Sequence, residues 1–114
     1  MIKLEELFEM QNDLDKYIVQ KSIGNVDHND IIFLKDRVTA IFTEVAEFAN
    51  ATRCFKYWSK KPAESKERLI DEYVDIFHFW LSIGNTMKFT VKEVEAAYHK
   101  KYAENIDRQD RGDY

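Results

Sequence analysis

Hydrophobic residues recur along this chain at steps of three and four, the spacing that places them on one face of an α-helix. The pattern predicts helices over about residues 2–21, 31–52, 63–83 and 91–106. In the first of these segments the apolar stripe consists of Leu4, Leu7, Phe8, Leu14, Tyr17 and Ile18. The chain contains only 3 Gly and 1 Pro, too few for the many turns of an all-β protein. We therefore expect an all-α bundle.

A few residues predict where these helices begin and end. Asp30 is a suitable N-cap for the second helix, and Pro62 suits the lead-in to the third. Gly84 is expected to stop the third helix, because glycine favours helix C-termini. Thr90 and Glu93 have the spacing of a capping box at the start of the fourth helix.

Length and charge narrow the classes of protein that this sequence can encode. The 114 residues suit one domain, residues 1–114, in which the polar residues 107–114 form a flexible tail. A net charge of −4 argues against a general nucleic-acid coat. No apolar run approaches the roughly 18 residues that a membrane span needs. We therefore expect neither nucleic acid nor membrane as a partner.

The single cysteine and the small size of the chain suggest its compartment and its assembly. Cys54 excludes an intramolecular disulfide and a cysteine-based zinc site, and it suits a reducing cytoplasm. The acidic N-terminus does not resemble a signal peptide, so we expect a cytoplasmic protein. A chain of this size leaves about a third of its unfolded-state surface exposed when it folds alone. We therefore expect a homo-oligomer, a dimer or a larger assembly.

Two pairs of acids occupy unusual positions on the second and third helices. On a helical wheel Glu72 falls inside the apolar stripe of the third helix, with Asp75 at its edge. An ionised carboxylate there is costly unless it is paired or bound to a metal. Glu44 borders the apolar stripe of the second helix, and Glu47 follows one turn later. The short connection makes the two helices antiparallel neighbours, so the four carboxylates are expected to converge around Mg²⁺, with Mn²⁺ as an alternative.

Ordinary structural roles remain open for these acids. Glu is a good helix former and lines solvated faces, so Glu44 and Glu47 alone fit a helix surface. Glu72 could instead form a buried salt bridge with a lysine or arginine. The joint pattern of two acidic pairs on neighbouring helices is more specific than either pair.

Basic and aromatic residues add candidates for nucleotide binding. Lys101, Asn105 and Arg108 share one face of the fourth helix if that helix continues, and their side chains suit phosphate oxygens. The alternative is the usual enrichment of cations at a helix C-terminus. The aromatic residues between the second and third helices could stack on a base, although packing in the core is the commoner role: Phe55, Tyr57 and Trp58.

Several segments resemble one protein family. EVAEFANATRCFKYWS (residues 44–59) and DEYVDIFHF (71–79) are similar to the all-α dUTP diphosphatases, the dimeric dUTPase branch related to MazG-type nucleotide pyrophosphohydrolases. KYAENIDRQ (101–109), followed by Gly112 and Tyr114, resembles that family's phosphate-binding motif, and FEMQNDLD (8–15) resembles its first motif. The resemblance implies a four- to five-helix bundle of the all-α NTP pyrophosphatase type.

The resemblance also implies roles for individual residues. Glu44, Glu47, Glu72 and Asp75 would bind Mg²⁺, and Glu47 is the preferred candidate for the base that activates water, although the sequence does not separate base from ligand. The residues that would bind the deoxynucleoside triphosphate are Gln11, Asp15, Lys56, Trp58, Lys101, Asn105 and Arg108.

The expected reaction is hydrolysis of dUTP to dUMP and diphosphate. The chain differs from the longer dimeric dUTPases because residues 84–89 connect the third and fourth helices directly, without extra helical sequence. A MazG-like pyrophosphohydrolase acting on dCTP, or on several nucleotides, is therefore the alternative enzyme. A non-catalytic helical module that binds a protein partner is the alternative from another class.

Overall fold

The computed structural model describes residues 1–113, and these residues form helices and no strands. The elements in chain order are α1 (Leu4–Ser22), the 3₁₀-helix η1 (Ile31–Phe33), α2 (Leu34–Thr52), α3 (Lys66–Thr86) and α4 (Val91–Arg111). The prediction of an all-α fold is therefore confirmed. Within the same residues, no helix is both long enough and apolar enough to pass through a membrane.

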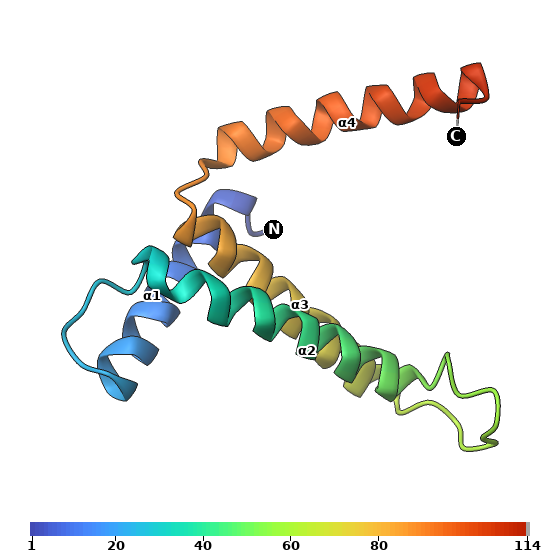
Figure 1. Ribbon diagram of the computed structural model, residues 1–114, viewed down its shortest axis with the longest axis horizontal. Coiled ribbons are helices and arrows are strands. Elements are labelled where there is room, and N and C mark those ends of the chain that lie inside the picture. The colour runs from blue at the N-terminus through green and yellow to red at the C-terminus, as the bar shows by residue number, and fades with distance from the viewer. Residues whose placement is uncertain (114) are drawn as a thin grey trace.

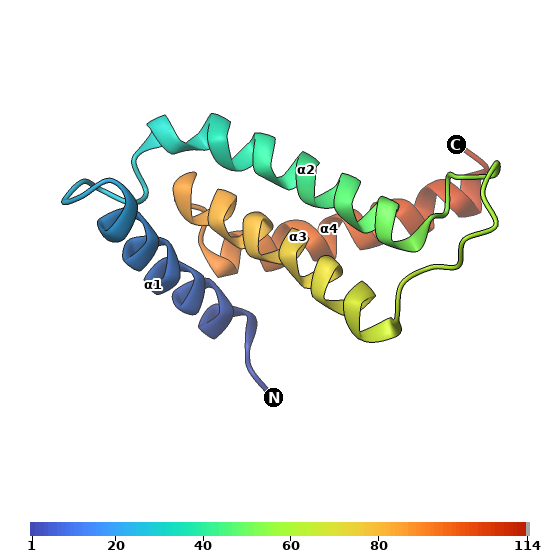
Figure 2. The same cartoon turned by 90° about the horizontal axis from the view of Figure 1, so that it is seen from below.

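Helices α2 and α3 form the centre of the structure. They run antiparallel and lie side by side in both views (Figures 1 and 2). Helix α1 packs across the C-terminal half of α3, where the side chain of Asn85 donates a hydrogen bond of 3.0 Å to the carbonyl oxygen of Phe8. Helix α4 contacts the rest of the chain mainly through α1 and then projects away from it (Figure 1). The acidic residues of α2 and α3 therefore lie in the packed part of the fold.

Two of the predicted helix starts are confirmed. The Asp30 side chain accepts a hydrogen bond of 2.9 Å from the backbone N–H of Ile32, although the first turn it caps is η1 rather than α2. Thr90 and Glu93 form the reciprocal capping box at the start of α4. Each cap satisfies backbone N–H groups that have no partner within their own helix.

The predicted boundaries of the third helix are wrong at both ends. Its N-cap is Ser65, whose hydroxyl accepts a hydrogen bond from the backbone N–H of Arg68, and Pro62 lies in the extended connection before it. The helix also continues through Gly84 to Thr86. A Cβ atom at position 84 would lie 2.8 Å from the ring of Phe8, so glycine is needed here for close packing of α1 rather than for a helix end.

The fourth helix is longer than predicted, because it includes residues 107–111 of the segment that was expected to form a flexible tail. Helix α4 continues to Arg111, where an ion pair of 3.1 Å with Asp107 links successive turns. It ends at Gly112, which adopts the left-handed conformation at φ 67°. Tyr114 lies outside the described residues.

The buried face of α1 also differs from the apolar stripe. The buried residues of this helix are Phe8, Gln11, Asp15 and Val19. The second half of the predicted stripe is exposed: Leu14, Tyr17 and Ile18. Helix α1 therefore turns polar side chains toward α3 and leaves an apolar strip uncovered.

Candidate functional site

Three carboxylates from two helices meet between α2 and α3. Glu44, Glu72 and Asp75 each offer one oxygen, and these oxygens lie within 4.8 Å of one another. Glu72 and Asp75 share a face of α3 because they are three residues apart, and Glu44 faces them from the antiparallel α2. The structure thus brings together three of the four acids that the sequence singled out.

Glu47 lies beside this group. It follows Glu44 by one turn of α2, is exposed, and forms a side-chain hydrogen bond with Glu44. Its charge also acts on Glu72 across the helix pair. We refer to Glu44, Glu47, Glu72 and Asp75 as the acidic cluster.

The acidic cluster resists full ionisation. Burial is the largest cause that raises the pKa of Glu44 from 4.5 to about 7, followed by the hydrogen bond to Glu47 and the charges of the other three acids. Burial and the charge of Glu47 likewise raise the pKa of Glu72, and the positive charge of Arg68 opposes them. Glu44 and Glu72 therefore hold protons more tightly than isolated carboxyl groups do.

Two oxygens of the acidic cluster have no hydrogen-bond partner. Glu44 Oε2 and Glu72 Oε2 are both buried and unpaired. A buried carboxylate oxygen without a partner loses its hydration and gains nothing in return. A divalent cation would satisfy both atoms, and a set of oxygen ligands suits Mg²⁺ or Mn²⁺. The residues therefore fit the metal that the sequence analysis expected.

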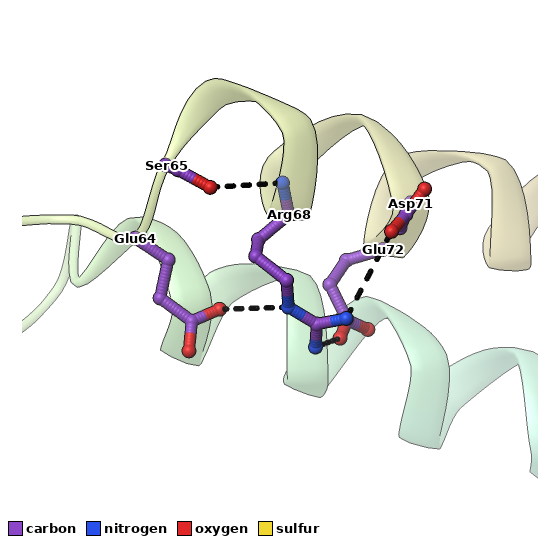
Figure 3. Close-up of polar contacts among 5 residues, drawn as sticks. All are labelled: Glu64, Ser65, Arg68, Asp71 and Glu72. Carbon is purple, nitrogen blue, oxygen red and sulfur yellow. Dashed lines mark hydrogen bonds and ion pairs between the residues drawn. The ribbon is translucent and has the colours of Figure 1, made fainter.

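Arg68 is a neighbour of the cluster that the sequence analysis missed. Its Nη2 donates a hydrogen bond of 2.9 Å to Glu72 Oε1 (Figure 3). The salt bridge considered for Glu72 is thus present, but the Arg68 side chain is 55% exposed and that of Glu72 is 12% exposed. The pair lies at the rim of the cluster and involves Oε1 of Glu72, so the buried Oε2 still lacks a partner. The four-residue spacing on α3 was the signal that could have revealed it.

Gln11 and Asp15 take part in a buried network between α1 and α3. Gln11 Nε2 donates to Asp15 Oδ1 at 2.9 Å, and Ser82 Oγ donates to Asp15 Oδ2 at 2.6 Å. Gln11 Oε1 is hydrogen-bonded to His78 Nδ1 at 2.5 Å. His78 lies one turn after Asp75, and the sequence analysis gave it no role. The network fixes α1 against the turn of α3 that follows the acidic cluster.

The aromatic connection between α2 and α3 lies on the surface. Phe55, Tyr57 and Trp58 are all exposed, Trp58 by 64%, so the alternative that they pack in the core is wrong. Trp58 contacts the rings of Phe55 and Tyr57 edge to face, and the Lys56 ammonium lies 5.7 Å from the centre of the Phe55 ring. These side chains are accessible to a ligand.

The phosphate-binding candidates of α4 lie away from the acidic cluster. Lys101 and Asn105 line a shallow hollow of about 380 Å³ on this helix, and Lys101 forms an ion pair of 3.6 Å with Glu104. Arg108 follows one turn after Asn105 on the same exposed helix. Because α4 projects away from α2 and α3, the structure does not bring these residues to the carboxylates of their own chain (Figure 1).

A protein-family model described as dUTPase matches residues 3–94, which include the whole acidic cluster. The chain belongs to the dUTPase family. The matched region ends within α4, before Lys101. The match therefore includes the acidic cluster, and it does not include the last turns of α4.

Two curated relatives are phage proteins. The dUTPase-family chain is 26% identical over 96 residues to the dCTP pyrophosphatase of Enterobacteria phage LZ5, covering 70% of this chain and 56% of that protein. It is 27% identical over 95 residues to the dCTP pyrophosphatase of Enterobacteria phage T4, covering 69% and 56%. The chain thus spans little more than half the length of these relatives. No solved structure matches it.

Proposed function

We propose that this dUTPase-family chain is a Mg²⁺-dependent nucleotide pyrophosphohydrolase that converts dUTP and water to dUMP and diphosphate. The observation that carries the proposal is the meeting of Glu44, Glu72 and Asp75, with two buried carboxylate oxygens left without partners. A structural role alone gives no reason to retain unpaired buried oxygens, whereas a cation site does.

The acidic cluster would hold the cation, and Glu47 would handle the proton. When bound, Mg²⁺ supplies positive charge that neutralises phosphate oxygens and lowers the pKa of water. Glu47 is exposed beside Glu44, and it would accept a proton from the attacking water. The new bond forms between the water oxygen and the α-phosphorus. The bond from that phosphorus to the bridging oxygen breaks, and diphosphate leaves with the electron pair.

We further propose that α4 completes the active site of a second copy of the chain, where it would bind the phosphates next to that copy's acidic cluster. Lys101, Asn105 and Arg108 suit phosphate oxygens, but their helix projects away from the acids of its own chain. The same helix exposes Tyr98 by 70% and Tyr102 by 60%, which favours burial against another subunit. A homo-oligomer would bring basic and acidic residues together.

The nucleoside would lie near the connection between α2 and α3. Trp58 is exposed and offers a ring for stacking on a base, and Lys56 adds a positive charge beside it. Gln11 and Asp15 remain candidates for recognition of the nucleoside. Their hydrogen bonds to His78 and Ser82 would then be exchanged for bonds to the substrate.

dCTP is the second candidate substrate. Both phage relatives are dCTP pyrophosphatases, which favours this nucleotide despite the family description. A MazG-like enzyme with several substrates is the broader form of the same alternative. The acidic cluster would serve each of these nucleotides equally, because the cation that it would hold interacts with the phosphates rather than with the base.

The test measures diphosphate release from each deoxynucleoside triphosphate, with Mg²⁺ and with EDTA. The proposal expects turnover of dUTP that needs Mg²⁺ and is lost in Glu72→Gln. The matched control is Glu67→Gln, which removes the same charge from an exposed position on α3. Turnover of dCTP alone, or of several nucleotides, supports the alternative substrates. If no nucleotide releases diphosphate, the result supports the non-catalytic helical module that binds a protein partner.

A further inference from the structure

We infer that Arg68 is the counter-ion of the acidic cluster in the metal-free protein and that it yields Glu72 to the divalent cation. The inference rests on the proposed function, because it requires a cation at the cluster. The inference gives Arg68, which is not a member of the acidic cluster, a role in the binding and release of the metal. Its consequence is that Arg68 weakens metal binding while it stabilises the metal-free state.

The ion pairs place Arg68 in this role. Among the residues that the structure describes, Arg68 is the single cation that forms an ion pair with any member of the acidic cluster. Its bond to Glu72 is short, at 2.9 Å, and comes from the solvent side of the cluster. Its positive charge offsets the repulsion between Glu72 and the neighbouring acids.

The contact with Glu72 is incomplete. Arg68 satisfies only Oε1 of this carboxylate, and Oε2 remains buried without a partner. A guanidinium can donate two parallel hydrogen bonds to a carboxylate, and that arrangement is the stronger one. A single bond at the rim suits a partner that gives way when a doubly charged ion arrives.

Arg68 has other partners within reach when it leaves Glu72. Its Nε lies 3.9 Å from Glu64 Oε2, and its Nη1 lies 3.9 Å from Asp71 Oδ2 (Figure 3). Both acids are more than half exposed, so neither belongs to the buried part of the cluster. The hydrogen bond from the Arg68 backbone to Ser65 anchors the first turn of α3, while the long side chain can turn toward these acids. The guanidinium therefore keeps a countercharge after release.

A fixed clamp is the competing role. If Arg68 only oriented Glu72 for the metal, its loss would disorder the ligand and weaken metal binding. A counter-ion acts in the opposite direction, because its positive charge competes with the metal for the same carboxylate. The sign of the change in metal affinity therefore separates the two roles.

The experiment titrates the full chain with Mn²⁺ alone, without nucleotide, by isothermal calorimetry. Arg68→Gln should lower the dissociation constant for Mn²⁺ by about three- to tenfold, the effect of losing one partly exposed ion pair. The matched control Lys66→Gln removes the same charge two residues away and sets the baseline, because Lys66 is exposed and forms no ion pair within residues 1–113. In EDTA, Arg68→Gln should also unfold at a lower temperature than Lys66→Gln.

A second variant keeps the test decisive if Arg68→Gln does not fold. Arg68→Lys retains the charge without the planar fork, so the counter-ion role expects a dissociation constant within about twofold of the parent. A dissociation constant that rises severalfold in Arg68→Lys, or that stays equal or rises in Arg68→Gln, overturns the inference. If the parent itself binds no Mn²⁺, the proposed metal site fails, and that result differs from every outcome above.

Discussion

Glu44 and Glu72 come from helices that run in opposite directions, and each carries one buried oxygen with no hydrogen-bond partner. Each carboxylate offers an oxygen within 4.8 Å of the other and of Asp75. The arrangement is costly without a cation, because like charges repel and the buried oxygens lack water. The behaviour of the metal-free protein should therefore reveal the site directly.

Replacing Glu44 should remove the response to metal without harming the fold. Glu44→Gln reduces the repulsion in the acidic cluster, so in EDTA the variant should unfold at the parent's temperature or above it. Saturating Mg²⁺ should stabilise the parent by about 2.7 kcal/mol at a hundredfold excess over the dissociation constant, and the variant much less. Thermal unfolding followed by circular dichroism measures both states. Glu95→Gln, an exposed change on α4, should keep the parent's response.

The metal-free protein should lose stability as pH rises through neutrality. The pKa of Glu44 is about 7 in the folded protein, compared with an ordinary value of 4.5 that applies to the unfolded chain. Between pH 4.5 and pH 7 the folded chain therefore binds more protons than the unfolded chain does. Unfolding then releases protons, and the free energy of unfolding falls with rising pH across this window.

Urea denaturation in EDTA at several pH values between 4.5 and 8 measures this dependence. Glu44→Gln, which imitates the protonated side chain, should show a shallower fall than the parent. Part of the slope should persist in the variant, because the pKa of Glu72 is raised as well. Identical slopes in the two proteins would show that Glu44 titrates normally.

The close approach of α1 to α3 makes Gly84 sensitive to any side chain. A Cβ atom there would lie 2.8 Å from Phe8 Cε1, and Phe8 is buried against Trp80. Gly84→Ala should therefore cost about 1–2 kcal/mol of unfolding free energy, even though alanine is the better helix former. Urea unfolding measures the loss. In a double-mutant cycle, Phe8→Leu should reduce the cost of Gly84→Ala, whereas additive effects would contradict a contact between the two positions.

The sequence predicted those features that depend on local spacing. The antiparallel helices with Glu44 and Glu72 on facing sides follow from periodicity and a short connection, and the Thr90 capping box follows from its spacing. Gly84 was misread because a glycine near a helix end and a glycine under a packed ring look alike without tertiary contacts. The buried face of α1 was missed because Gln11 becomes favourable inside only when His78 lies opposite it.

The separation between α4 and the acidic cluster leads to a test of site sharing between subunits. Glu72→Gln damages the metal site and leaves α4 intact, while Arg108→Ala damages α4 and leaves the metal site intact. If each site combines the acids of one chain with α4 of another, an equal mixture of the two inactive variants forms mixed dimers with one complete site. Random pairing in a two-fold dimer then restores about a quarter of the parent's diphosphate release.

The mixing experiment needs proof that subunits associate and exchange. Light scattering at micromolar concentration should give at least the dimer mass, because α4 and the strip formed by Leu14, Tyr17 and Ile18 leave apolar surface exposed on a single chain. Mixing Glu72→Gln with a second acidic-cluster variant, Asp75→Asn, is the matched control and should restore nothing, since both changes damage the same half of the site. A monomeric mass, or a mixture of Glu72→Gln and Arg108→Ala that stays inactive after subunit exchange, would show that α4 does not complete the site of a neighbouring chain.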